Sequence, residues 1–334
     1  MYRIALILLL SLLLCNPAAG QAESIQAESI QAESIQEIPP LFPGGKISMK
    51  KWEVEPLADG VYGFRYTFYR NIFIVTDEGV IATDPMNAEA AAVMRREISR
   101  ITDQPVRFVS YSHSHWDHVS GGAVFKAEGA RFVAQEGCVE HFVENPNPDV
   151  VMPDITYPDR YEIELGGKSL EMLYFGPSHD SCLVVMVVKP ANLLFMVDTA
   201  NPPDGWAMFY NPAVSEDRVW HMVPFLTRVQ ALVEERDIET VIGAHMTMGR
   251  NPQTGRPGII PGTQGPSTVI AERLAFWSAL IDVVQAEIAR GTPPDQVPDL
   301  LVEQRVLADR ISGYNPAKMH VLLQRITSYA VTGE

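Results

Sequence analysis

The sequence has little positive charge. It contains 26 lysine and arginine residues against 41 aspartate and glutamate residues, and its formal net charge is −15. Such an excess of negative charge repels the phosphate backbone of nucleic acids and the surface of anionic membranes, so neither is an expected partner. The composition is otherwise 46% hydrophobic and 20% charged, which is typical of an ordinary globular protein.

Cysteine is also scarce, and the chain has only Cys15, Cys138 and Cys182. Cys15 lies in an N-terminal segment that we expect to be removed. An oxidising compartment would permit a disulfide between Cys138 and Cys182, but the sequence does not show that the two residues are close in space. We favour two isolated buried thiols.

No apolar run at the N-terminus is long enough for a membrane span. Residues 4–14 are too few to cross a bilayer comfortably. Arg3 before this run and the small residues 18–20 after it are typical of a signal peptide that is cleaved before Gln21. We therefore expect a periplasmic or secreted product with no integral membrane span after cleavage. A lipid anchor at Cys15 is the alternative, which the large residue before that cysteine disfavours.

The chain is expected to have four parts. Residues 1–20 are the signal peptide. Residues 21–35 contain Gln-Ala-Glu-Ser-Ile three times, a unit too short for a solenoid repeat, and we interpret residues 21–50 as a low-complexity spacer without chemistry. Residues 51–260 are the expected catalytic domain. Residues 261–334 are the expected C-terminal helical extension.

Strand patterns and helix patterns alternate in the catalytic domain. A helix is predicted over residues 88–101, with Asn87 as its N-cap, and another over residues 215–235. Residues 106–111 are typical of a buried strand and end at a histidine-rich segment. Strands alternating with helices in both halves of the domain predict an α/β (α+β) sandwich.

The histidine-rich segment carries the chemistry. Within residues 112–118, His113, His115, Asp117 and His118 are four potential ligands. Imidazole and carboxylate groups are good zinc ligands. In an extended chain His113 and His115 point to the same side and can meet one ion, and Asp117 and His118 can then turn toward a second. A loop after a strand end is also where an α/β protein usually builds its site.

Three further motifs follow in order. Gly-Pro-Ser-His ends at His179, an apolar strand ends at Asp198, and Gly-Ala-His ends at His245. Together with His-x-His-x-Asp-His, this order resembles the metallo-β-lactamase superfamily over residues 55–250. The resemblance implies a four-layer αββα sandwich, and Ala244 departs from the more usual Gly before the last histidine.

The resemblance also implies a site for two Zn²⁺ ions per chain, although the ligand types permit iron or manganese as well. Asp117 would additionally orient the catalytic water, and Asp84 would orient a ligand from behind. The implied ligands are His113, His115 and His179 for the first ion, Asp117, His118 and His245 for the second, and Asp198 as the bridge.

The predicted function is that of a dinuclear zinc-dependent hydrolase. It would use a metal-bound hydroxide on an ester, lactone or thioester bond of a small to medium apolar substrate. A class B3-like β-lactam hydrolase is one alternative, which Asp198 disfavours because one group of true β-lactamases has Cys there. A mononuclear iron oxidoreductase acting on sulfur compounds is another, and the full set of second-site ligands speaks against it. A non-catalytic partner protein is a third.

Aromatic residues near the ligands are candidates for a substrate pocket. Trp206, Phe209 and Tyr210 lie in the loop after Asp198, and Trp116 and the turn at residues 66–70 would form the opposite wall. The alternative is that these aromatic side chains pack against helices. The C-terminal extension could cap the site, form the face of a homo-oligomer or cover the sandwich core, and we favour the last role.

Overall fold

The computed structural model describes residues 35–38, 47–208, 218–250, 257–260 and 264–333. The predicted signal peptide, residues 21–34 of the repeat, Phe209 and Tyr210 lie outside this part of the chain. The chain divides into two compact units, Met1–Trp52 and Glu53–Glu334. In the first unit, β1 (Ile35–Ile38) pairs antiparallel with β2 (Ile47–Lys50), a hairpin within the segment that we interpreted as a spacer.

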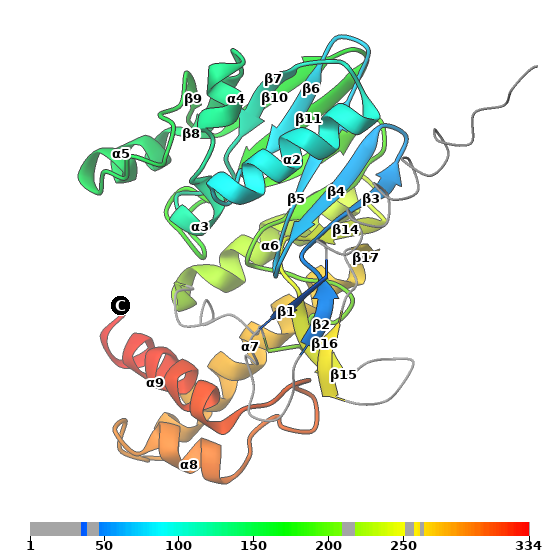
Figure 1. The fold of residues 1–334 in the computed structure, drawn as a ribbon. Coiled ribbons are helices and arrows are strands. Elements are labelled where there is room, and N and C mark those ends of the chain that lie inside the picture. The colour runs from blue at the N-terminus through cyan, green and yellow to red at the C-terminus, as the bar shows by residue number, and fades with distance from the viewer. Residues whose placement is uncertain (1–34, 39–46, 209–217, 251–256, 261–263, 334) are drawn as a thin grey trace, which may run out of the picture. The chain divides into compact units, whose positions relative to one another are not determined.

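The second unit contains a seven-stranded sheet with the order β3-β4-β5-β6-β7-β8-β9 (Figure 1). Strands β4 to β6 are antiparallel neighbours, and β6 to β9 run parallel to one another. The parallel strands end at the same edge of the sheet. The strands are β3 (Trp52–Ala58), β4 (Val61–Tyr66), β5 (Tyr69–Val75), β6 (Val80–Thr83), β7 (Val106–Ser110), β8 (Arg131–Gln135) and β9 (Ile155–Tyr157).

A six-stranded sheet has the order β10-β11-β12-β13-β14-β17. Its pairings are antiparallel except for the parallel pair β13 and β14. Two further strands, β15 (Thr247–Arg250) and β16 (Pro257–Ile260), pair only with each other among the described residues. The sheet strands are β10 (Arg160–Leu165), β11 (Lys168–Tyr174), β12 (Val184–Lys189), β13 (Leu193–Met196), β14 (Thr240–Gly243) and β17 (Gln264–Pro266).

The two large sheets pack face to face, and the sequence of β12 shows why. Val184 and Met186 point into a core shared with Ile72 of β5, so they lie between the sheets. Val185, which points to the opposite side, belongs to a second core together with Phe225 of a helix. A strand buried on both faces needs an unbroken apolar run, and β12 has one.

Helices cover the outer face of each sheet (Figure 1). Helix α2 (Ala88–Ile101) begins after the predicted N-cap, Asn87, whose side chain accepts the Ala90 N–H. Its Met94 Sδ atom lies 3.1 Å from the side-chain amide of Asn71 in β5, so the helix packs against that sheet. The six-stranded sheet shares its outer core with the C-terminal helices. These two helical layers and two sheets confirm the predicted αββα sandwich with C-terminal helices. The predicted boundary at residue 260 stays a prediction. The remaining helices are α3 (Trp116–Val119), α4 (Ala123–Ala127), α5 (Glu136–Glu144), α6 (Val219–Glu235), α7 (Thr268–Ala289), α8 (Val297–Glu303) and α9 (Pro316–Thr332).

A buried carboxylate in β11 is paired with three cationic side chains. Glu171 has a fully buried side chain and pairs with Arg160 at 2.5 Å, Arg236 at 2.6 Å and Lys189 at 2.7 Å. Burial works against its ionisation, but hydrogen bonds from these cations lower the pKa of Glu171 to about 2. The cluster joins β10, β11, β12 and the end of α6.

Cys138 and Cys182 form a disulfide, with their Cα atoms 5.4 Å apart. Our preference for two isolated thiols is therefore wrong. The reason is topological. Helix α5, which carries Cys138, follows β8, and β8 ends at the same edge of its sheet as β7. The loop that carries Cys182 enters β12 beside that edge, where the Val184 N–H donates to the Ser112 carbonyl.

Among the described residues, no helix is long and apolar enough for a membrane crossing.

Candidate metal centre

The ends of five strands bring the predicted ligands together. His113 follows β7, Asp198 follows β13, and His245 follows β14. His179 lies in the loop that joins β11 to β12, and Asp84 follows β6. Because β6 runs parallel to β7 and β13 runs parallel to β14, each pair of strands delivers its carboxyl end to one edge of its sheet.

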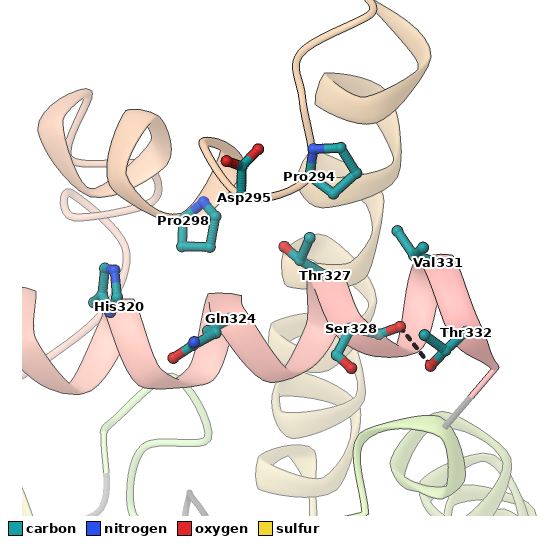
Figure 2. Close-up of a pocket in the computed structure, with 9 residues that line it drawn as sticks. All are labelled: Pro294, Asp295, Pro298, His320, Gln324, Thr327, Ser328, Val331 and Thr332. Carbon is teal, nitrogen blue, oxygen red and sulfur yellow. Dashed lines mark hydrogen bonds between the residues drawn. The ribbon is translucent and has the colours of Figure 1, made fainter.

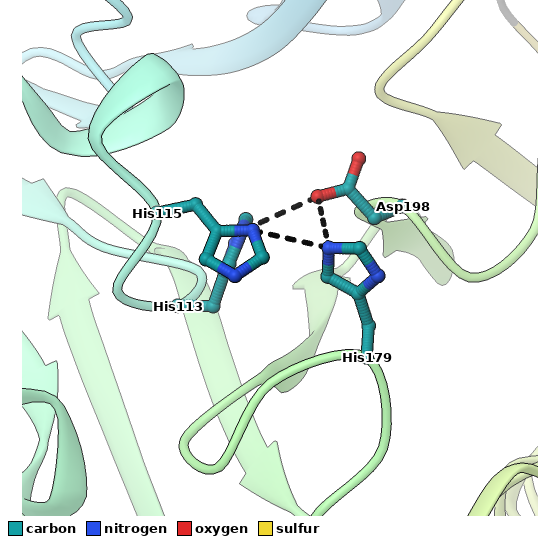
Figure 3. A group of neighbouring side chains, drawn as sticks. All are labelled: His113, His115, His179 and Asp198. Atoms are coloured by element: carbon teal, nitrogen blue, oxygen red, sulfur yellow. Dashed lines mark hydrogen bonds and ion pairs between the residues drawn. The ribbon is translucent and has the colours of Figure 1, made fainter. Parts of the chain in front are cut away.

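The first group consists of His113, His115, His179 and Asp198, whose potential ligand atoms lie within 4.8 Å of one another. Figure 3 shows His113 and His115 on one segment, with His179 and Asp198 converging on them from two other loops. The Oδ2 atom of Asp198 lies 3.2 Å from His113 Nε2 and 3.3 Å from His179 Nε2. His179 Nε2 also lies 3.1 Å from His115 Nδ1. Three imidazole nitrogens and one carboxylate oxygen therefore share one small volume.

The second group consists of His118, Asp198 and His245, again within 4.8 Å. Asp198 Oδ2 lies 3.4 Å from His118 Nε2, while its Oδ1 atom contacts His245 Nε2. The two histidine nitrogens are 3.2 Å apart. Asp198 thus belongs to both groups and presents a different oxygen to His245 than to the other histidines. This is the arrangement of a bridging carboxylate.

Asp117 belongs to neither of these groups. Its residue is exposed at the start of the short helix α3, next to His118. Partial desolvation works against its ionisation, but the neighbouring His118 imidazole holds the pKa of Asp117 below its ordinary value. The structure therefore places an ionised carboxylate at the margin of the second group, and its role as a ligand stays a prediction.

The chemistry of these atoms fits divalent metal. Among the described residues, His113 Nε2, His118 Nδ1 and Asp198 Oδ1 are buried without a hydrogen bond, which is costly for polar groups. Burial lowers the pKa of His113 to about 3, so this imidazole is neutral and can offer a lone pair. Burial also opposes ionisation of Asp198, but His118, His245 and the other imidazoles keep its pKa well below the ordinary value. The nearby Asp198 carboxylate instead outweighs burial and raises the pKa of His118 to about 9, so His118 must release a proton to bind metal. Imidazoles around a carboxylate are a donor set that suits zinc.

Asp84 contacts the histidine-rich segment through both oxygens of its side chain. Its Oδ1 atom accepts the Ser112 N–H at 2.8 Å, and its Oδ2 atom lies 3.9 Å from His118 Nδ1. The residue has a φ of 26°, and the Asn71 side chain donates to its carbonyl at 2.7 Å. Burial raises the pKa of Asp84 to about 6. These contacts agree with the expectation that Asp84 orients a ligand.

Several residues at the site were not singled out from the sequence. The buried Asp180 carboxylate accepts the Ser114 N–H at 3.0 Å, and Asn201 Oδ1 accepts the His245 N–H at 3.0 Å. The Tyr69 ring meets the imidazoles of His118 and His245 edge-on, with centroids 5.5 Å and 4.8 Å away. Asp180 directly follows a predicted ligand, which is a usable signal in retrospect. Asn201 depends on how separate loops meet and has no such signal, and Tyr69 was predicted only as part of the turn at residues 66–70.

The predicted pocket aromatics take different positions. Trp116 is 47% exposed beside the ligands and is free to contact a substrate. Trp206 instead packs against Phe276 of α7, and the Arg310 guanidinium lies 3.8 Å from its ring centroid. For Trp206 the structure favours the alternative, in which the aromatic side chain packs against the C-terminal helices.

The three histidines without a predicted chemical role stay away from these groups. His320 lies 3.0 Å from the Asp299 carboxylate in a shallow pocket beside α9 (Figure 2). His141 lies on α5, and His221 lies on α6 next to Trp220. The pocket of Figure 2 is lined by none of the predicted ligands.

Comparison with known proteins agrees with this geometry. The family model of the metallo-beta-lactamase superfamily matches residues 65–218. The metallo-beta-lactamase from Pontibacter korlensis has a similar fold, with a TM-score of 0.56, 19% sequence identity, and coverage of 68% of this chain and 99% of that one. The alpha subunit of 2,4-dinitroanisole O-demethylase from Nocardioides sp. (strain JS1661) is 26% identical over 162 residues, which are 46% of this chain. The match spans 49% of the length of that relative.

The sandwich fold and the two histidine groups that share an aspartate define a protein of the metal-binding αββα class. The matched family model, the similar fold and the curated relative together support the metallo-β-lactamase superfamily for this chain. The His/Asp cluster fits a metal cofactor.

Proposed function

We propose that this chain is a hydrolase that holds two zinc ions and cleaves an ester, lactone or thioester bond in a small to medium apolar substrate. The observation that carries the proposal is the double membership of Asp198 in both histidine groups. A carboxylate that faces two sets of imidazoles suits a pair of ions a few ångströms apart better than it suits a single ion. The superfamily supplies hydrolase chemistry as the leading reaction class.

The ligands proposed for the first ion are His113, His115 and His179, and those for the second are Asp117, His118 and His245, with Asp198 between them. Two zinc ions held there would polarise the scissile carbonyl and lower the pKa of water to about 7, which makes a Ser or Cys nucleophile unnecessary. The neutral state of His113 and the ionised state of Asp198 suit metal binding, whereas His118, with a pKa of about 9, must first release a proton.

The residues around the ligands suit an apolar substrate. Asp117 is ionised and exposed, so its carboxylate can orient the attacking water and accept its proton. Trp116, directly before it, offers an exposed aromatic surface to an apolar group of the substrate. Tyr69, whose ring meets the imidazoles of His118 and His245 edge-on, can add to the same wall of the pocket.

A panel of lactones, thioesters, aryl esters, sulfate and phosphate esters, and β-lactams tests this proposal. The protein is assayed with added zinc and with a chelator. Hydrolysis of an ester-type substrate that the chelator abolishes is expected. His115→Ala should remove turnover, whereas His320→Ala, which loses an imidazole that belongs to neither group and lies beside Asp299, should retain it. Preference for the β-lactam, or turnover that survives the chelator, would contradict the proposal.

A second candidate function comes from the Nocardioides relative, whose name states that it removes the O-methyl group of 2,4-dinitroanisole and that it is a subunit. The same donor set could activate water against an electron-poor aryl methyl ether, with a phenol and methanol as products. Methanol release from 2,4-dinitroanisole measures this reaction directly. A rate above that of any ester in the panel would reverse the ranking of the two candidates.

Export to the periplasm or the medium is proposed for the same chain. The Cys138–Cys182 disulfide supports it, because disulfides persist in oxidising compartments. Cell fractionation of the natural host checks this, with the mature N-terminus expected at Gln21. A full-length chain in the cytoplasm would contradict it.

A further inference from the structure

One carboxylate at the site is not among the residues proposed as metal ligands. Asp180 is the residue after His179, and it is only 5% exposed. Its Oδ2 atom lies 3.9 Å from Nε2 of His115, while Nδ1 of the same imidazole faces His179. Asp180 therefore stands behind His115, on the side of the ring away from the first group.

The hydrogen bonds of Asp180 join two separate ligand segments. Its Oδ2 atom accepts the Ser114 N–H at 3.0 Å and the Ser114 hydroxyl. Its Oδ1 atom accepts the Cys182 N–H at 2.7 Å and the Ser181 hydroxyl at 3.1 Å. Ser114 lies between His113 and His115, so one side chain fixes their segment to the loop that carries His179.

A covalent tether acts on the same loop. The Cys138–Cys182 disulfide attaches the loop to the first turn of α5 only two residues after Asp180. The loop thus has one fixed point on α5 and one on the histidine-rich segment. Without the carboxylate, the disulfide and the Val184–Ser112 hydrogen bond still hold the ends of the loop, but the hydrogen bonds from Ser114, the residue next to His115, are lost.

We propose that Asp180 is a positioning residue that sets the spacing of His115 and His179 and thereby the metal affinity of the first group. This rests on the proposed function only in its metal-binding part. The residue does not touch a reacting atom. It acts by holding Ser114 and Cys182, and by standing behind His115 as an outer partner of the kind whose loss weakens metal binding about 10–100-fold.

The test is zinc binding by the metal-free full-length protein, measured by competition with a chromophoric chelator and without any substrate. Asp180→Asn keeps the shape of the side chain but turns one acceptor into a donor, which repels either the Ser114 or the Cys182 N–H. We expect the affinity of one of the two zinc ions to fall by at least about tenfold, with the other little changed. Ser114→Ala is a milder change and should give a smaller fall in the affinity of the same zinc ion. It replaces Asp180→Asn as the test if that variant does not fold.

Asp154→Asn is the matched control. Asp154 also accepts a backbone N–H, from Phe132 at 2.8 Å, but it lies away from the site and pairs with Lys126. Zinc binding by this variant should equal that of the wild type. Affinity within twofold of wild type in Asp180→Asn, or an equal loss in the control, would overturn the inference. A wild-type protein that binds no zinc would overturn both proposals, whereas zinc binding without hydrolysis would overturn only the proposed function.

Discussion

Removing the Cys138–Cys182 disulfide should lower the free energy of unfolding by about 4 kcal/mol. The two cysteines are 44 residues apart in the sequence. Closing a loop of that length in the unfolded chain costs about 13 cal/mol/K of entropy, which is about 4 kcal/mol at 25 °C. The disulfide removes this cost because the loop is already closed before folding. Cys138 and Cys182 are both fully buried, so the crosslink belongs to the packed interior.

The assay is denaturant unfolding of the wild type with and without reductant, next to a Cys138→Ser/Cys182→Ser double variant. The reduced wild type and the double variant should both unfold at a lower denaturant concentration than the oxidised protein. Reductant should have no effect on the double variant, which makes it the control for other actions of the reagent. A loss below about 1 kcal/mol, or two free thiols in the oxidised protein, would refute the reasoning.

Three further perturbations test separate parts of the structure. Glu171 has a pKa of about 2 in the folded protein against an ordinary value near 4.5, so its stabilisation is present above pH 4.5 and lost as the pH falls toward 2. The shift corresponds to at most about 3 kcal/mol, and solvent screening of its partly exposed partners reduces this to about 1–2 kcal/mol. Glu171→Gln should flatten the loss of unfolding free energy between pH 5 and pH 3, on the order of that difference, and an unchanged slope would speak against the cluster. Asp84→Ala should weaken zinc binding by about 10-fold or more in a chelator competition assay, because the Ser112 N–H loses its acceptor. Unaltered zinc affinity would leave Asp84 with a turn-forming role only. Trp116→Ala should raise KM for an apolar ester with little effect on Tm, because Trp116 is exposed. Trp206→Ala should lower the unfolding free energy by about 2 kcal/mol and leave KM unchanged, because Trp206 packs against Phe276. The reverse pattern would contradict the positions of the two side chains.

The fold could be predicted because its signals are local. The α2 segment has apolar residues at helical spacing and an asparagine at the position where its side chain caps the helix. The apolar run of β12 is typical of a strand buried on both faces, and β12 lies between the second sheet's two cores. The pairing of β1 with β2 was not predicted, because strands of four residues are too short to show a clear apolar pattern.

The candidate ligands could be picked out from their order along the chain, and the structure brings six of the seven into two groups; their binding of metal stays a prediction. The contacts that hold those ligands could not be predicted from the sequence. The Asp180 carboxylate reaches Ser114 across 66 residues of sequence, and the disulfide joins Cys138 to Cys182 across 44. Such contacts depend on which loops meet at the edge of the sandwich, and this is decided by packing rather than by any local pattern.

Metal stoichiometry is the most direct test of the central claim, which is that one aspartate serves two groups of histidines. Native mass spectrometry of the full-length protein, loaded with zinc and freed of excess, counts the ions bound to each chain. The wild type should hold two zinc ions, His245→Ala should keep one, and Asp198→Ala should lose both or hold them only weakly. A wild-type protein that saturates with a single ion, or an Asp198→Ala variant that keeps two, would contradict the account.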